Sequence, residues 1–135
     1  MIHSIIFDTM NHTIIFLYFK EVLMTKLEDL FGRCPYATTQ KILSGKWALM
    51  LLHILNNETL RFNEIQRRMP EMTQTTLTRQ LRSLEEYGLI ERKVYAQIPP
   101  KVEYSMTDIG EEFAVVLRSI ENFGNKYIEV TVPNS

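Results

Sequence analysis

Hydrophobic residues are most concentrated near the middle of the chain. Residues 46–55 are apolar on almost every side of a helix, and helices with this pattern lie buried at the centre of a core. Gly45 separates this segment from an earlier helical stretch at 37–43, and the pair Asn56-Asn57 provides a turn after it. The pattern therefore predicts a short helix, a break at glycine and then the central helix of the core.

A short helix is predicted to follow. Residues 59–62 have an extended character, and the segment after them carries the apolar pair Ile65 and Met69 at helical spacing. We expect Asn63 to cap this helix, because Gln66 follows three residues later in an arrangement close to a capping box. Pro70 then ends it.

The next predicted helix is longer and amphipathic. Thr73 is expected to cap its start, and Gly88 is expected to end it. At about 100° per residue, one face of the helix holds Leu77, Leu81 and Leu84. The opposite face holds Thr75, Arg79, Arg82 and Glu86. This division suits a recognition helix, which needs an apolar face toward the core and polar, cationic groups toward DNA, but other amphipathic surface helices share it.

A β-hairpin is predicted directly after that helix. Residues 89–95 and 102–107 alternate as strands do and are rich in β-branched and aromatic residues. Two prolines stiffen the connecting loop at 96–101. The hairpin carries cations at Arg92, Lys93 and Lys101, which is typical of a wing that contacts the DNA backbone or minor groove. The predicted fold is mostly α with a small β-hairpin wing, a winged helix-turn-helix of the α+β class.

The last helix carries an apolar stripe. Thr107 can cap this helix, and Ala114 and Leu117 widen the stripe. Its members recur at the alternating spacings of 4 and 3 that form a heptad seam, at Ile109, Phe113, Val116, Ile120, Phe123 and Tyr127. The stripe can cover its own domain or bind a second copy. Because it continues past Gly124, where little core remains to pack against, the pattern favours a homodimer.

The first 23 residues differ in character from the rest. They include an apolar run at 14–19, which is too short to span a membrane and has neither a preceding cation cluster nor a small-residue cleavage site. Met24 opens a segment typical of an ordinary soluble helix. Our hypothesis is that translation starts at Met24; the alternative is a genuine N-terminal helix that packs on a partner subunit. We therefore divide the chain into an extension at 1–23, a DNA-binding domain at 24–107 and a dimerisation helix and tail at 108–135.

Charge and reactive residues exclude several classes of function. The formal net charge is −1, but basic residues exceed acidic ones at 61–107 and acidic residues predominate after that. A single cysteine, Cys34, rules out an internal disulfide and suits the reducing cytoplasm. The scattered His3, His12 and His53 lack the spacing of metal ligands. No phosphate loop, nucleophile elbow or catalytic triad pattern is present, so we expect neither an enzyme nor a cofactor.

The chain resembles the HxlR-type branch of bacterial winged-helix regulators, which is related in shape to the MarR type. The resemblance is carried by Gly-Lys-Trp at 45–47, Leu-Arg-Phe-Asn-Glu-Ile at 60–65, Leu-Thr-Arg-Gln-Leu-Arg-Ser-Leu-Glu at 77–85, Gly-Leu-Ile-Glu-Arg at 88–92, and Pro-Pro-Lys-Val-Glu-Tyr-Ser-Met-Thr at 99–107. The segment before Met24 departs from the pattern. The resemblance implies a homodimer that binds an operator, and it implies that Cys34 can sense oxidants or electrophiles.

The expected DNA-binding residues lie on the amphipathic helix and the hairpin. Thr75, Arg79 and Arg82 are expected to face the bases, with Gln74 and Thr78 beside them. Arg92 and Lys101 are expected to meet phosphates. Trp47 and Tyr104 are assigned to the core.

Two other functions stay open at this stage. A small molecule bound at the dimer interface can provide the signal, and a winged helix can serve as a protein-interaction module without DNA. A membrane partner is not expected.

Overall fold

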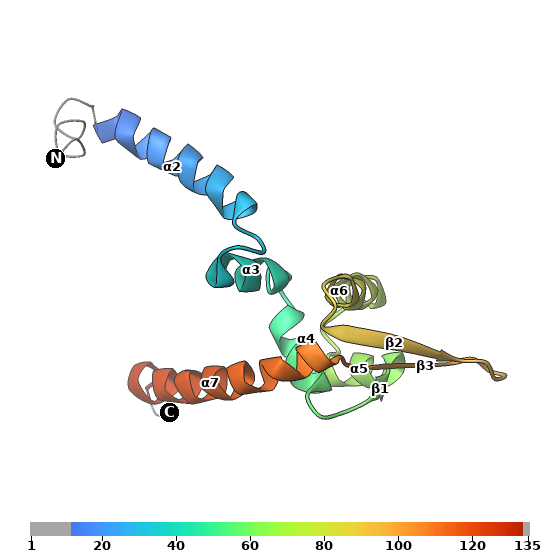
Figure 1. Cartoon of the computed structure of the whole chain (residues 1–135). Helices are drawn as coiled ribbons and strands as arrows, with labels where there is room; N and C mark the ends of the chain where they lie inside the picture. Colours follow the sequence, from blue (N-terminus) through green and yellow to red (C-terminus); the bar gives the residue numbers. More distant parts are fainter. Residues whose placement is uncertain (1–11, 134–135) are drawn as a thin grey trace. The chain divides into compact units, whose positions relative to one another are not determined.

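The computed structural model describes residues 12–133, apart from the side chains at 18 and 22–28 (Figure 1). The chain divides into two compact units between residues 41 and 42. The first unit contains helix α2 (His12–Asp29) and helix α3 (Pro35–Ile42), whose last residue belongs to the second unit. Helix α3 confirms the short helix predicted at 37–43.

Helix α2 runs through Met24 without a break. Several of its large apolar side chains are exposed, namely Ile14, Phe16, Leu17 and Phe19. Residues 1–11 of the extension at 1–23 lie outside the described residues, and the proposed boundary at Met24 stays a prediction. None of the helices described here is long and apolar enough to cross a membrane.

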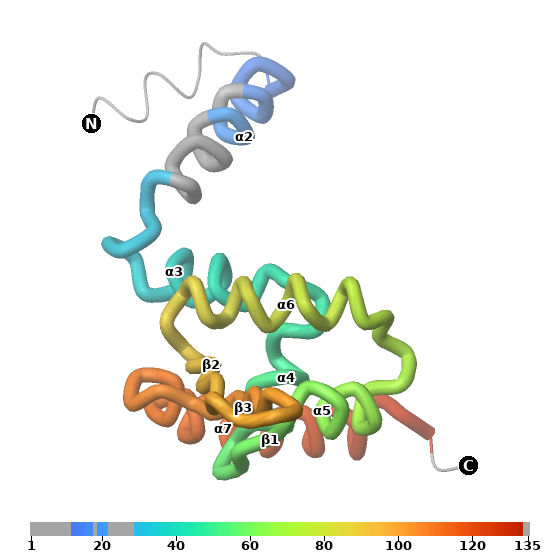
Figure 2. Tube along the Cα trace, turned by 90° about the vertical axis from the view of Figure 1, so that its right-hand side faces the viewer, coloured from blue at the N-terminus to red at the C-terminus, as the bar shows by residue number. Residues whose placement is uncertain are grey.

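The second unit follows the predicted order of elements. It consists of α4 (Ala48–Leu55), β1 (Leu60–Arg61), α5 (Phe62–Arg68), α6 (Gln74–Glu86), β2 (Ile90–Tyr95), β3 (Lys101–Met106) and α7 (Asp108–Thr131). The three strands form an antiparallel sheet in the order β1-β3-β2. Figures 1 and 2 place α6 and α7 on different sides of strands β2 and β3. The winged helix-turn-helix fold is confirmed.

One hydrophobic core joins the elements of the second unit. Its fully buried side chains come from the central helix α4, from α5, from α6 and from the start of β2: Leu51, Leu52, Leu55, Ile65, Leu77, Leu81, Leu84 and Ile90. The three leucines predicted to face inward from α6 are all among them. Tyr104 is buried in this core, and the half-buried Trp47 packs against the core.

The predicted cap of the short helix is wrong by two residues. Helix α5 begins at Phe62, so Asn63 is its second residue and not its cap. The Arg61 N–H donates to the Glu64 carboxylate at 3.1 Å, which satisfies the first free donor of the helix. The chain turns into the helix directly from strand β1, where Arg61 pairs with Glu103 of β3, so there is no room for a separate capping turn.

The turn between α5 and α6 is closed by side chains. The Gln66 amide donates to the carbonyl oxygens of Met69 and Met72. The Thr73 hydroxyl accepts from the Thr76 N–H at 3.2 Å, which confirms it as the cap of α6. Gly88 follows the end of α6 with a positive φ of 77°, the left-handed conformation expected of a glycine in this position.

Candidate nucleic-acid interface

The outward face of α6 forms a single open groove. The groove is lined by Gln74, Thr75, Thr78, Arg79, Arg82, Ser83 and Glu86. It contains all five residues of this helix that were expected to contact DNA. The Thr78 hydroxyl donates to the Gln74 carbonyl at 2.8 Å, so that proton is used within the helix. The other side-chain donors that line this groove are the guanidinium groups of Arg79 and Arg82, the Gln74 amide, and the hydroxyls of Thr75 and Ser83.

Arg92 of the hairpin joins the same surface. It pairs with Tyr104 across β2 and β3, and paired residues of an antiparallel sheet point to the same face. Arg92 and Tyr104 line a second hollow together with Thr78, Arg82, Glu85 and Glu86, three of which also line the groove on α6. We refer to the union of the groove and this hollow as the α6–β2 surface.

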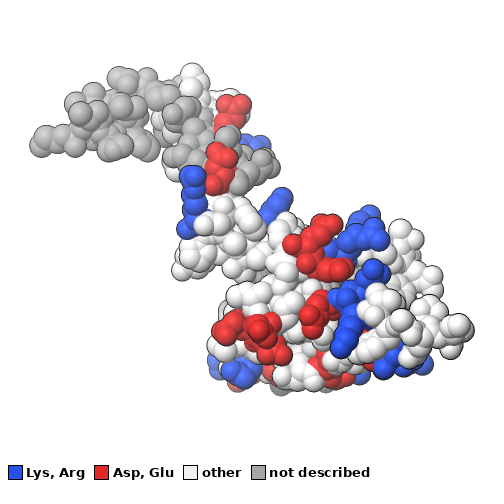
Figure 3. Space-filling view, turned by 45° about the vertical axis from the view of Figure 1, so that its right-hand side comes forward, with Lys and Arg blue, Asp and Glu red and all other residues white. Residues whose placement is uncertain are grey.

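Charge on the α6–β2 surface is mixed. In Figure 3, basic side chains gather on one face of the second unit, with acidic side chains beside them. Burial raises the pKa of the Tyr104 phenol above its ordinary value, while the nearby Arg92 and Arg82 act in the opposite direction. The phenol therefore stays protonated at neutral pH and lies close to two cations of the surface.

The structure separates Lys101 from the rest of the predicted site. Along β3, Lys101 and Glu103 alternate with Tyr104, so they lie on the opposite face of the sheet. The Lys101 ammonium lies 2.8 Å from a Glu103 carboxylate oxygen and 4.8 Å from the centre of the Tyr95 ring. The Tyr95 hydroxyl donates to the other Glu103 oxygen at 3.1 Å. A phosphate would therefore compete with the Glu103 carboxylate for the Lys101 ammonium.

The predicted seam on α7 divides into two parts. In the first half, Phe113 packs against the core, and Gly110 and Leu117 are buried beside it. On the other edge of the stripe, Ile109, Val116, Phe123 and Tyr127 are exposed. The ring centroids of Phe123 and Tyr127 lie 6.2 Å apart, and both rings are exposed. Phe113 and Leu117 therefore pack within the domain, while Ile109 and Val116 in the first part of the helix and the two rings near its end stay exposed.

Cys34 lies directly before the first residue of α3. Its side chain is half-buried, and its carbonyl oxygen accepts a hydrogen bond from the Thr38 hydroxyl at 2.7 Å. That hydroxyl oxygen in turn accepts from the Gly32 N–H at 2.9 Å. The thiol is thus held at a well-defined helix start. Among the described residues, no group of three His, Cys, Asp or Glu side chains could hold a metal ion.

Some residues of the α6–β2 surface were missed by the sequence analysis. Ser83 lies one turn after Arg79, so helical spacing alone could have added it, whereas Glu86 was placed on this face but not among the expected DNA contacts. The role of Gln66 in closing the turn had no sequence signal, because it depends on carbonyl groups exposed only in the folded turn.

A model of the HxlR-like helix-turn-helix family matches residues 42–132, which contain every element from α4 to α7. The chain belongs to the HxlR-like helix-turn-helix family. The resemblance inferred from the sequence is thereby confirmed, and the protein is a helix-turn-helix regulator of transcription.

The match covers most of this chain and most of each similar protein. The HTH-type transcriptional regulator YdeP of Bacillus subtilis is 46% identical over 99 residues, which are 73% of this chain and 77% of YdeP. The solved structure of the redox regulator HypR in its reduced form has a TM-score of 0.68 at 38% identity and covers 72% of this chain and 96% of its own. Reduced YodB from B. subtilis has a TM-score of 0.64 at 26% identity and covers 76% and 98%.

The ion pair on the wing can be tested by titration. Lys101 is the main reason that the pKa of the Glu103 carboxyl lies below its usual value, and the Tyr95 hydroxyl contributes to this. We expect Lys101→Met to raise the pKa of Glu103, as measured by carbon-detected NMR of the side-chain carboxyls against pH. A lowered pKa stabilises the fold above the pKa of the unfolded chain, and this contribution is lost as the pH falls through the lowered value.

Lys93→Met is the matched control for this titration. The Lys93 ammonium also lies over the Tyr95 ring, at 5.0 Å, but it makes no ion pair with Glu103 among the described contacts. An equal pKa change in both variants would contradict the assigned pair.

Proposed function

We propose that this protein is a cytoplasmic, homodimeric regulator that binds DNA sequence-specifically, with α6 in the major groove. The observation that carries the proposal is the α6–β2 surface, which brings Thr75, Arg79 and Arg82 of α6 together with Arg92 of the wing. Guanidinium groups donate two parallel hydrogen bonds to guanine, and threonine bonds to several base edges. A groove with these donors suits the reading of bases better than the binding of a small apolar ligand.

The composition of this surface argues against a pure protein-interaction module. Such modules place aromatic or aliphatic anchors at the centre of the contact. None of the large exposed apolar side chains of the described chain lines the α6–β2 surface, and most of them lie on α2 and α7. The α6–β2 surface is therefore equipped for a charged, hydrogen-bonding partner.

The open part of the α7 seam supports the dimer. Side chains such as Phe123 and Tyr127 are exposed in the single chain, and burying them against a second copy removes apolar area from water. A two-fold axis then presents two α6 helices to half-sites about one turn of DNA apart. The expected operator is pseudo-palindromic.

Selection of operators from random double-stranded DNA tests the proposal as a whole. The full chain is incubated with the library, and bound DNA is sequenced after several rounds at stated salt concentration. We expect enrichment of an inverted repeat. No enrichment above a library carried through without protein would contradict DNA recognition.

Arg79→Ala and Arg82→Ala test the reading of bases. Each is expected to weaken binding to the selected operator by about 1–3 kcal/mol if the arginine is bidentate to guanine, and to relax selectivity at one base pair. Fluorescence anisotropy with the operator and with single-base variants measures both effects.

Arg118→Ala is the control, because Arg118 is an exposed arginine on α7 outside the α6–β2 surface. The assignment would be refuted if all three variants bound the operator alike.

Phe123→Glu tests the dimer. A buried carboxylate without a partner is strongly unfavourable, so we expect this variant to be monomeric at micromolar concentration in light scattering. Asn125→Glu adds the same charge on the opposite side of α7 and should leave the dimer intact. Monomeric wild-type protein, or a dimeric Phe123→Glu, would exclude this seam as the interface.

We further propose that Cys34 switches DNA binding in response to oxidation or alkylation. HypR, to which this chain is similar, is described as a redox regulator, and YodB is known in a diamide-treated form. Since Cys34 is the only cysteine, its oxidised product must be an intersubunit disulfide, a mixed disulfide or an adduct. A small-molecule effector at the dimer interface is the alternative signal.

Cys34→Ser tests the switch. Diamide is expected to release the wild-type protein from its operator, and dithiothreitol to restore binding, while Cys34→Ser stays bound throughout. The readout is the bound fraction of operator in gel shift. Release of Cys34→Ser by diamide would remove the thiol from the mechanism.

A further inference from the structure

Thr107 connects the start of α7 to the end of α6. Its hydroxyl donates to the Gly88 carbonyl at 2.5 Å and accepts from the Gly110 N–H at 3.1 Å. Its own N–H donates to the Leu89 carbonyl at 3.0 Å. One residue thus caps α7 and is bonded to two of the three residues that lead from α6 into β2.

Gly88 and Leu89, whose carbonyl groups accept these bonds, are themselves hydrogen-bonded to α6. The Gly88 N–H donates to the Glu85 carbonyl at 2.9 Å, and the Leu89 N–H donates to the Leu84 carbonyl at 3.0 Å. These bonds hold the connection against the last turn of α6, as expected of a helix end with a left-handed glycine. Gly88 and Leu89 are therefore hydrogen-bonded both to the last turn of α6 and to Thr107.

Gly110 allows the start of α7 to lie close to the connection between α6 and β2. A Cβ atom at this buried position would lie 2.0 Å from the Leu89 carbonyl oxygen, which is a backbone atom and cannot move aside as a side chain does. The first turn of α7 is therefore packed directly on the α6–β2 connection. Any larger residue must displace one of the two elements.

We propose that Thr107 is a positioning residue that fixes the direction of α7 relative to α6 and thereby sets the half-site spacing that the dimer accepts. This inference rests on the proposed function, in which α6 binds the half-site and the far part of α7 binds the second copy. Gly110 supports the same junction by allowing the close approach.

The length of α7 explains why a small change at Thr107 matters. With 24 residues and a rise of about 1.5 Å per residue, the helix is about 36 Å long. A tilt of about 10° at its start moves its far end by roughly 6 Å. Since successive base pairs are about 3.4 Å apart, such a shift corresponds to almost two base-pair steps between the half-sites.

The test compares variants on operators of different spacing. Inverted repeats of the selected half-site are prepared with spacers that vary in single base-pair steps, and an isolated half-site serves as the reference DNA. Thr107→Val keeps the branched shape but removes the hydroxyl, Thr107→Ser keeps the hydroxyl, and Gly110→Ala adds the obstructing methyl group. Leu52→Val is the control for a general loss of stability, because Leu52 lies in the core on α4.

We expect wild type, Thr107→Ser and Leu52→Val to prefer one spacer by at least tenfold. Thr107→Val and Gly110→Ala should bind the isolated half-site as wild type does. Their preference among spacers should either fall to a few-fold or shift to a different spacer. An unchanged spacer preference in Thr107→Val would overturn the inference. This outcome is decisive even if Gly110→Ala does not fold. Wild-type protein that selects no operator overturns the proposed function instead, and the inference with it.

Discussion

The burial of one face of α6 determines where the groups that we propose to face DNA lie. Leu77, Leu81 and Leu84 are at most 1% exposed and pack into the core built on α4. Because helix geometry is fixed, seating this face directs Thr75, Arg79 and Arg82 outward together. The rotation of α6 is thus set by packing, and its surface chemistry follows from that rotation.

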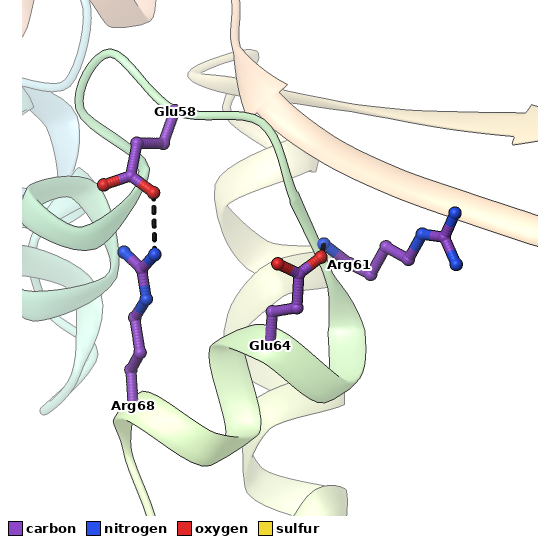
Figure 4. A network of polar contacts seen from close by, with 4 residues as sticks. All are labelled: Glu58, Arg61, Glu64 and Arg68. Atoms are coloured by element: carbon purple, nitrogen blue, oxygen red, sulfur yellow. Dashed lines mark hydrogen bonds and ion pairs between the residues drawn. The ribbon is translucent and has the colours of Figure 1, made fainter.

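The net charge of the chain is −1, and part of its positive charge is used in ion pairs away from the α6–β2 surface. Figure 4 shows one pair, Arg68 with Glu58 at 2.7 Å, beside the contact between the Arg61 backbone and Glu64. The bond to Arg68 lowers the pKa of the Glu58 carboxyl, so the pair persists at neutral pH. In such a pair the cationic side chain stabilises local structure. On the α6–β2 surface, Glu85 and Glu86 repel phosphate, which weakens general attraction to DNA and leaves base contacts a larger share of the affinity.

The sequence predicted the elements well because their signals are local, and it predicted the site less completely. The leucine period of α6, the cap at Thr73 and the alternation of the hairpin each depend on residues within a few positions. The cap of α5 failed because Arg61 is also held in a strand by the distant β3. Lys101 was grouped with Arg92 as a wing cation, although strand register puts the two on opposite faces. The register between strands is not written in any single segment.

The two parts of α7 differ in what holds them helical, and this links folding to assembly. The first part is anchored by Thr107 and by Phe113 and Leu117 on the core. From residue 121 onward the helix has no buried side chain in the described chain. An unsupported segment of this length is marginal as a helix in water. In the proposed dimer, a second copy that covers Phe123 and Tyr127 would supply the missing burial, so the far end of α7 would gain stability by mass action as the dimer forms. The geometry that would place two α6 helices on DNA is then completed only by assembly.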